Sequence, residues 1–291
     1  MTIAIASGKG GTGKTFVSVN LFFSLSEEGR NVVLADCDAE APNAAGFFDT
    51  QVLSATHIFQ MVPVINEQAC TWCGRCQEYC AYHAIFLVAS MEVIRVQEDL
   101  CHGCGACLLA CEDGAITEDK RSVGTVTQFN VPGHGVLTEA RMQTGVMSPV
   151  PVIKAAITRA RSLPGTLILD APPGTSCPFI HTVAAADYVV LVTEPTPFGL
   201  SDLKQSLEVL KQLNKPAGVV INRSGTKDRE MQAFLLQEHI PLLLDIPFER
   251  SIARDHSRGR LVAAGRADLQ ENFNGMYRKI RQYVGNGSHQ R

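Results

Sequence analysis

Eight of the ten cysteines in this 291-residue chain lie in two runs with the same spacing, C-x2-C-x2-C-x3-C. The first run comprises Cys70, Cys73, Cys76 and Cys80, and the second comprises Cys101, Cys104, Cys107 and Cys111. The match extends beyond the cysteines, because Gly74 corresponds to Gly105 and Ala84-Ile85 corresponds to Ala115-Ile116. Such self-similarity at a fixed period indicates an internal duplication. The segment is therefore expected to fold around two equivalent groups of cysteines.

Three cysteines in one tight loop, followed by a fourth, form the ligand pattern of a [4Fe–4S] cluster. In two-cluster ferredoxins the fourth cysteine serves the other cluster, and the segment resembles bacterial-type ferredoxins in this spacing. By that resemblance Cys70, Cys73, Cys76 and Cys111 would hold one cluster, and Cys101, Cys104, Cys107 and Cys80 the second. A pair of zinc sites is the alternative, but zinc sites usually use paired C-x2-C hooks. One departure is that Ala81 and Glu112 replace the proline that usually follows the fourth cysteine.

The composition is that of a globular protein, with 45% hydrophobic residues. A chain of this length can bury a sizeable core, which favours one large domain plus a small one. The cysteine motif needs thiolates, so it indicates a reducing compartment. Residues 2–6 read directly as an apolar strand without the pattern of a signal peptide. No apolar run reaches the ~18 residues that span a bilayer. We therefore expect a cytoplasmic protein.

Charge is unevenly distributed along the chain. The net charge is only −3, yet residues 62–118 contain Arg75 and Arg95 against eight acidic residues, a net −6. An acidic module would repel nucleic acid and favour a basic docking face on a redox partner. The alternative is a solvated acidic surface without any partner.

Outside the cysteine segment, strand and helix patterns alternate. The strand candidates are short, nearly continuous apolar runs: Thr2–Ala6, Asn31–Ala35, Thr166–Leu169, Tyr188–Val192, Ala217–Ile221 and Leu242–Ile246. Such runs are typical of parallel strands covered on both faces. We therefore predict a doubly wound, mostly parallel α/β domain formed by residues 1–61 and 119–291. Residues 62–118 would be an inserted α+β ferredoxin-like module. Residues 120–146 give no clear assignment.

The first strand runs into a glycine-rich loop that satisfies G-x4-G-K-[ST]. Its residues are Gly8, Lys9, Gly10, Gly11, Thr12, Gly13, Lys14 and Thr15. Backbone N–H groups of such a loop surround phosphate oxygens, and the following helix adds its positive dipole end. Lys14 should contact the β- and γ-phosphates, and Thr15 should ligate Mg²⁺. A nucleotide site is therefore predicted.

Lys9 makes this loop resemble the deviant Walker A motif of MinD/ParA/Mrp ATPases and of the nitrogenase iron protein. In that group the additional lysine reaches the phosphates of a partner subunit, so the resemblance implies an ATP-dependent homodimer or heterodimer. The alternative for Lys9 is a solvated loop lysine. Segments 193–200 and 246–250 look specifically like MinD-superfamily ATPases that carry an inserted ferredoxin domain.

Three aspartates extend the resemblance. Asp36 and Asp38 match the family's switch I segment, and Asp170 matches the Walker B position before switch II. The resemblance implies that Asp38 orients or deprotonates the attacking water. Asp36 and Asp170 would support the Mg²⁺ shell. Helix caps or turns are the alternative roles for such carboxylates, but strand C-termini are where α/β sheets bind ligands.

Residues near the C-terminal strands resemble the family's base pocket. Asn222 and Arg223 match its adenine-reading segment, and Pro247 matches the other side of that pocket. The sequence lacks a GTP-type N-K-x-D motif, since Ala217 stands where its aspartate would be required. ATP is therefore favoured over GTP.

Together these features predict a dimeric iron–sulfur ATPase that uses ATP for electron transfer or for metal or Fe–S cofactor assembly on an unknown partner. The alternative is a MinD/ParA-like positioning or regulatory switch whose clusters are structural or redox-sensing. We expect no nucleic-acid partner, because the acidic module would repel it. We also expect no membrane partner, because the helical stripe from Phe273 to Val284 favours packing on the α/β domain. Cys37 and Cys177 are expected to be ordinary free cysteines rather than ligands of a third metal site.

Overall fold

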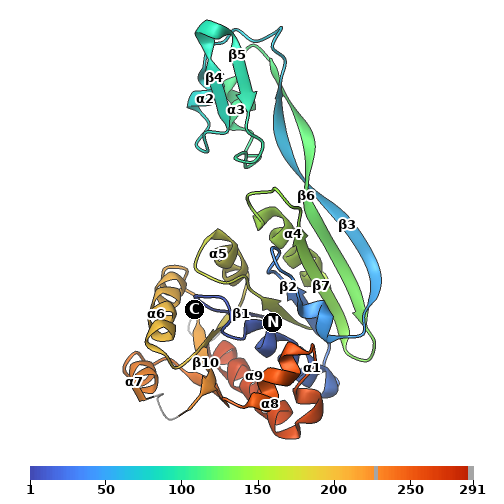
Figure 1. Cartoon of the computed structure of the whole chain (residues 1–291), viewed down its shortest axis with the longest axis vertical. Helices are drawn as coiled ribbons and strands as arrows, with labels where there is room; N and C mark the ends of the chain where they lie inside the picture. The colour runs from blue at the N-terminus through green and yellow to red at the C-terminus, as the bar shows by residue number, and fades with distance from the viewer. Residues whose placement is uncertain (226–228, 288–291) are drawn as a thin grey trace.

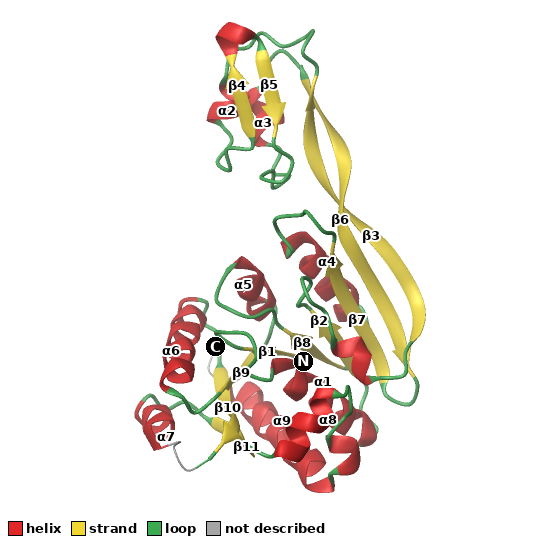
Figure 2. Ribbon diagram, in the orientation of Figure 1, coloured by secondary structure: helices red, strands yellow, loops and turns green. Residues whose placement is uncertain are grey.

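The computed structural model describes residues 1–225 and 229–287. Its centre is a nine-stranded sheet of order β11-β10-β9-β1-β8-β2-β7-β6-β3 in the described part (Figures 1 and 2). Six parallel strands are those predicted: β1 (Thr2–Ala6), β2 (Val32–Asp36), β8 (Thr166–Asp170), β9 (Tyr188–Thr193), β10 (Ala217–Ser224) and β11 (Leu242–Pro247). The mostly parallel α/β prediction is thus confirmed. β7 (Gly135–Met142) extends the sheet parallel to β2.

Helices cover both faces of the sheet, which explains why its strands are apolar runs. On one face lie α1 (Lys14–Glu27), α8 (Arg250–Ser257) and α9 (Ala267–Gly287). On the other face lie α4 (Val150–Arg161), α5 (Cys177–Ala184), α6 (Pro197–Gln212) and α7 (Arg229–Gln237). The C-terminal stripe packs as predicted, with Phe273 and Ile280 fully buried in the core shared with α1. In the described ranges no helix is both long and apolar enough to cross a membrane.

Two long antiparallel strands leave this sheet as a ribbon. They are β3 (Gln51–Ile65) and β6 (Ile116–Val131), and their pairing runs from Gln51↔Asn130 to Ile65↔Ile116. One end of β6 also pairs with β7, whereas its other end projects beyond the sheet (Figure 1). The sequence did not indicate this hairpin, which includes much of the unassigned stretch 120–146. The predicted module boundaries at 62 and 118 fall inside the two strands.

Residues 66–115 form a small cysteine-rich module at the tip of the ribbon, apart from the helices of the main sheet (Figure 2). It contains the hairpin β4 (Ile85–Val88) and β5 (Val93–Val96), and the short helices α2 (Arg75–Glu78) and α3 (Ala106–Ala110). The internal repeat is visible, because each short helix follows a glycine in the left-handed region, Gly74 and Gly105. The module has its own small core, made of Cys76, Ile85, Ile94 and Cys107 together with Ile116, the first residue of β6.

Candidate nucleotide site and cysteine cavities

The glycine-rich loop lies between β1 and α1, at the carboxyl edge of the sheet. Gly11 and Gly13 have φ values of 79° and 99°, which glycine adopts without strain. A side chain at Gly13 would also lie 2.3 Å from the amide nitrogen of Asn222. The loop therefore requires glycine there, for both its backbone conformation and its packing.

A cavity of about 400 Å³ opens in front of this loop, within the size range of small-molecule sites. It brings together predicted residues that are far apart in the sequence: Gly10, Gly11, Gly13, Lys14, Thr15, Asp38, Asn222, Arg223 and Pro247. Gly8, Lys9 and Thr12 instead line a smaller adjoining pocket against α6. Asp36 and Asp170 are buried beneath the cavity at the ends of β2 and β8, where they are register partners.

Burial shifts the pKa values of the charged side chains beneath the cavity, because their mutual attraction does not fully offset the loss of water. Burial lowers the pKa of Lys14, while the charges of Asp170 and Asp38 oppose this shift. Burial raises the pKa of Asp170 to about 6. Within the described residues neither carboxylate oxygen of Asp170 makes a close hydrogen bond, although both are buried. The hydroxyls of Thr15 and Ser18 lie near enough only to offset part of the rise in its pKa. A buried carboxylate so weakly satisfied by the protein is suited to a cation such as Mg²⁺ or its bound water.

Asp36 differs from Asp170 because its carboxylate is fully engaged. Its Oδ1 accepts the N–H of Asp38 at 3.1 Å, and its Oδ2 accepts those of Asn43 and Ala44, both at 2.9 Å. Burial and the charge of Asp170 raise its pKa well above the usual range. Asp36 thus organises the loop that holds Asp38 at the cavity, and its predicted place in the Mg²⁺ shell stays a prediction.

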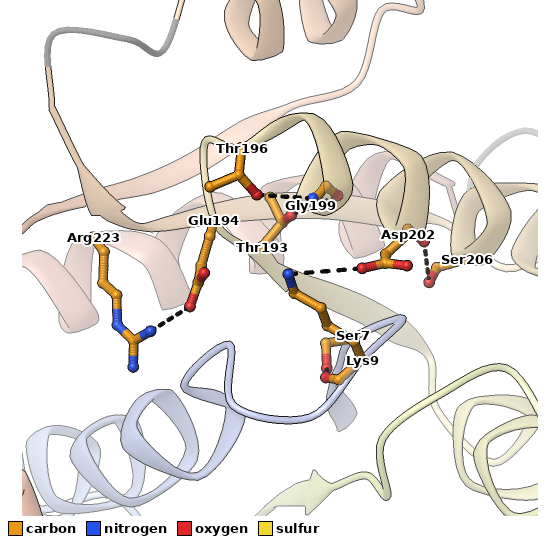
Figure 3. A network of polar contacts seen from close by, with 9 residues as sticks. All are labelled: Ser7, Lys9, Thr193, Glu194, Thr196, Gly199, Asp202, Ser206 and Arg223. Carbon is orange, nitrogen blue, oxygen red and sulfur yellow. Dashed lines mark hydrogen bonds and ion pairs between the residues drawn. The ribbon is translucent and has the colours of Figure 1, made fainter.

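Lys9 makes an ion pair within the chain, with 3.9 Å between its Nζ and the carboxylate of Asp202 on α6 (Figure 3). The Ser7 hydroxyl donates to the Lys9 carbonyl at 2.5 Å and fixes the loop locally. Helix α6 starts where the Thr196 hydroxyl accepts the N–H of Gly199 at 3.0 Å. In this structure the Lys9 side chain is therefore held against α6.

Asn222 braces the glycine-rich loop. Its Nδ2 donates to the carbonyl of Thr12 at 2.8 Å, and its Oδ1 accepts the N–H of Arg223 at 3.0 Å. Arg223 in turn pairs with Glu194 at 2.5 Å (Figure 3). An amide nitrogen has two donors, so Asn222 retains one for a ligand. Its predicted contact with adenine is not tested by these bonds.

Helix α8 supplies a wall of the cavity that sequence reasoning missed. Glu249, just before the helix, and Ile252, Ala253, His256 and Ser257 line the cavity. The His256 ring stacks on Phe47 at 4.9 Å and meets Phe16 edge-on at 5.4 Å. The signal available in the sequence was the three- and four-residue spacing of these positions, which places them on one helix face.

The eight clustered cysteines line two separate cavities of the module. Cys70, Cys73, Cys76 and Cys111 line one, and Cys80, Cys101, Cys104 and Cys107 line the other. Each cavity thus takes three cysteines from one run and the fourth from the other run, which is the grouping that the resemblance to bacterial-type ferredoxins implies; their role as cluster ligands stays a prediction. Within residues 1–225 and 229–287, no three metal-binding side chains gather closely enough to hold a single ion. Each set of four could instead surround a multi-atom cluster.

The two remaining cysteines differ in environment. Cys37 is fully buried, and burial raises its thiol pKa well above the ordinary value, with a smaller effect from neighbouring Asp36. A protonated, buried thiol is a poor nucleophile and metal ligand. Cys177 is exposed at the first position of α5. Their expected role as ordinary free cysteines stays a prediction.

Comparison with known proteins identifies the family. The sequence matches the CobQ/CobB/MinD/ParA nucleotide binding domain over residues 3–262. The chain belongs to this family. A protein of Methanocaldococcus jannaschii described as uncharacterized is 31% identical over 264 residues, covering 89% of this chain and 90% of that protein. As a member of the CobQ/CobB/MinD/ParA family, the chain carries a nucleotide-binding α/β domain.

Two further relatives bear on fold and function. The iron-sulfur cluster carrier protein of Rickettsia felis is 25% identical over 258 residues, covering 86% of this chain and 62% of the carrier. The cell division ATPase MinD of Pyrococcus furiosus superposes with a TM-score of 0.58 at 20% identity, covering 97% of this chain and 98% of MinD. At that identity the likeness to MinD concerns the fold alone.

Proposed function

We propose that this protein is a Mg²⁺-dependent ATPase that acts as a dimer and carries two [4Fe–4S] clusters. The observation that carries the proposal is the grouping of cysteines. Two interleaved sets of four line separate cavities on a module attached to a P-loop body. This interleaving fits two all-cysteine clusters, in which the fourth ligand of each cluster comes from the other motif.

ATP hydrolysis is assigned to the cavity in front of the glycine-rich loop. Loop amides and Lys14 would bind the phosphates, while Thr15 and Asp170 would hold Mg²⁺ with its water. Asp38 would accept a proton from the water that attacks the terminal phosphate, which releases ADP and inorganic phosphate. Asn222, Arg223 and Pro247 would hold the base. Lys9 would leave Asp202 and reach the phosphates bound by a partner subunit.

We propose nucleotide-gated electron transfer as the output, since clusters with all-cysteine ligation are suited to carry electrons. Assembly of an Fe–S cofactor on a client protein is the second candidate. It is favoured by the relatives of Rickettsia felis and Methanocaldococcus jannaschii that are named iron-sulfur cluster carrier proteins. Iron content after repeated ATP turnover distinguishes the two outputs. Electron transfer leaves the clusters on the protein, whereas cofactor assembly passes iron to an acceptor apoprotein.

The test is anaerobic purification followed by iron and sulfide analysis, with redox titration in the presence and absence of ATP and Mg²⁺. The proposal predicts about eight iron and eight sulfide atoms per chain, and cluster potentials that change with nucleotide. Lys9→Ala should retain the clusters but lose ATP-dependent dimerisation and most ATP turnover. Zinc without iron would refute the cluster assignment, and unchanged turnover of Lys9→Ala would refute the cross-subunit role.

A further inference from the structure

We propose that Gln60 and Arg121 are positioning residues that fasten the second cluster's ligand loop to the ribbon. Through this clasp the loop would follow movements of residues 37–43, the segment after β2 that holds Asp38. The inference rests on the proposed function, because it assigns a route by which the nucleotide site influences one of the two clusters.

The clasp is a set of contacts between the ribbon and residues 98–103. The Nε2 of Gln60 donates to the carbonyl of Cys101 at 2.6 Å. Arg121, the register partner of Gln60, pairs with Asp99 at 2.5 Å and with Glu98 at 3.6 Å. Its side chain is 23% exposed, which favours a defined position. Two ion pairs of Arg121 and the hydrogen bond of Gln60 thus hold the loop from two adjacent strands.

Gly103 brings the same loop against the ribbon backbone. Its φ is 63°, and a Cβ on this residue would lie 2.8 Å from the carbonyl oxygen of Met61. Only glycine permits such a close approach. The second cysteine run is therefore in direct contact with β3, two residues after its first cysteine.

The first cysteine run lacks such a clasp. In the described part of the chain, the side-chain polar contacts around residues 70–76 stay inside the module. Thr71 donates to Asp113 at 2.7 Å, and Arg75 pairs with Glu112. Residues 66–115 are thus bound unequally to the ribbon, although they arise from a duplication. The first cavity meets the ribbon through the apolar side chains of Ile65 and Ile116, whereas the second is also held by the polar contacts of Gln60 and Arg121.

The middle of the ribbon is linked to the nucleotide site through backbone hydrogen bonds. The N–H of Met142, the last residue of β7, donates to the carbonyl of Ala39 at 2.9 Å, next to Asp38. The N–H of Gln143 donates to the carbonyl of Val123 on β6 at 3.0 Å. Arg121 lies on the same strand, two residues before Val123.

This route contains a β-bulge, since the pairing changes from Ile58↔Gly124 to Phe59↔Ser122 and leaves Val123 as the additional residue. Bulges bend a strand and increase its twist. A shift of Ala39 when nucleotide binds would therefore move β6 at its bend, and the clasp would transmit the movement to Cys101.

The experiment uses the anaerobically purified full chain, with Arg121→Gln and Gln60→Leu as clasp variants. Arg95→Gln is the matched control, because Arg95 makes an ion pair with Glu67 inside the module, at 3.3 Å. Amide hydrogen exchange of residues 98–103 is measured with and without a non-hydrolysable ATP analogue and Mg²⁺. The electron paramagnetic resonance spectrum of the reduced clusters is recorded under the same conditions.

In the wild type we expect a several-fold nucleotide-dependent change in exchange of residues 98–103 and a change in one cluster signal. Both changes should be lost in the clasp variants and retained in Arg95→Gln, with iron content and basal ATP hydrolysis unaltered in all three. Unresponsive exchange in a wild type that hydrolyses ATP would overturn the inference, as would identical behaviour of Arg121→Gln and Arg95→Gln. A wild type without iron or hydrolysis would instead count against the proposed function, since the exchange measurement requires neither.

Discussion

The ammonium group of Lys9 lies 3.9 Å from the carboxylate of Asp202 in the same chain. The two side chains are about one-third exposed. Such partly exposed ion pairs contribute about 0.2–1 kcal/mol. This weak contact can be exchanged for a phosphate without a large energetic cost.

Replacing Asp202 with Asn should therefore favour the ATP-bound dimer, because Lys9 no longer has to leave its internal partner. We expect up to about a fivefold increase in apparent dimer affinity, which corresponds to ~1 kcal/mol. Sedimentation across a range of ATP concentrations measures it. Glu67→Gln, which removes a different exposed ion pair on the module, serves as the control. A weaker dimer in Asp202→Asn would contradict the expectation.

The raised pKa of Asp170 predicts that the stability of the fold decreases as the pH rises. Burial raises its pKa from 3.8 to about 6, so ionisation of this carboxyl opposes folding above that pH. The effect is largest above pH 6 and disappears below about pH 4, where the carboxyl is protonated in both the folded and the unfolded state. Asp170→Asn should therefore stabilise the Mg²⁺-free protein at pH 8 by roughly 3 kcal/mol.

Urea unfolding of Asp170→Asn and the wild type at pH 8, 6 and 4 measures this difference, with chelator present. The difference in unfolding free energy should change little between pH 8 and pH 6 and should fall mainly between pH 6 and pH 4. The variant should also lose Mg²⁺-dependent ATP hydrolysis. A stability difference that is constant across this pH range would show that Asp170 is not held in the raised-pKa state.

Crossed ligation makes a specific prediction for single cysteines. Cys80→Ser should damage the cluster of Cys101, Cys104 and Cys107, although it belongs to the other run. Iron should fall from about eight to about four atoms per chain. The remaining signal should match that of Cys104→Ser rather than that of Cys73→Ser. The opposite match would mean that each run holds its own cluster.

The C-terminal helix should contribute strongly to stability. Phe273 is fully buried between α9 and α1, so Phe273→Ala leaves a cavity and should cost about 3–5 kcal/mol of unfolding free energy. Tyr283 on the same helix is 47% exposed. Tyr283→Ala should therefore have a clearly smaller effect in the same denaturant titration. Equal losses would argue against the described packing of α9.

Local sequence patterns were sufficient for the parallel strands and for the nucleotide loop, because continuous apolar runs and glycine spacing are short-range signals. They were not sufficient for the ribbon. β3 and β6 stabilise each other across a long separation, and much of β3 is solvent-exposed, with its alternate residues mostly only half-buried, so its apolar pattern is weak. The contact between Asn222 and Thr12 is equally long-range. A periodic pattern describes only local structure, so it does not show that the amide of Asn222 will contact the glycine-rich loop.

The pairing of Ile65 with Ile116 means that the chain enters and leaves the module on adjacent, antiparallel strands. For the rest of the sheet, the fifty intervening residues are equivalent to the turn of a hairpin. An ancestral gene could have gained such a segment at a hairpin tip without altering the order of any strand. By the same property, we expect that a two-residue turn could replace the module while the sheet keeps its topology.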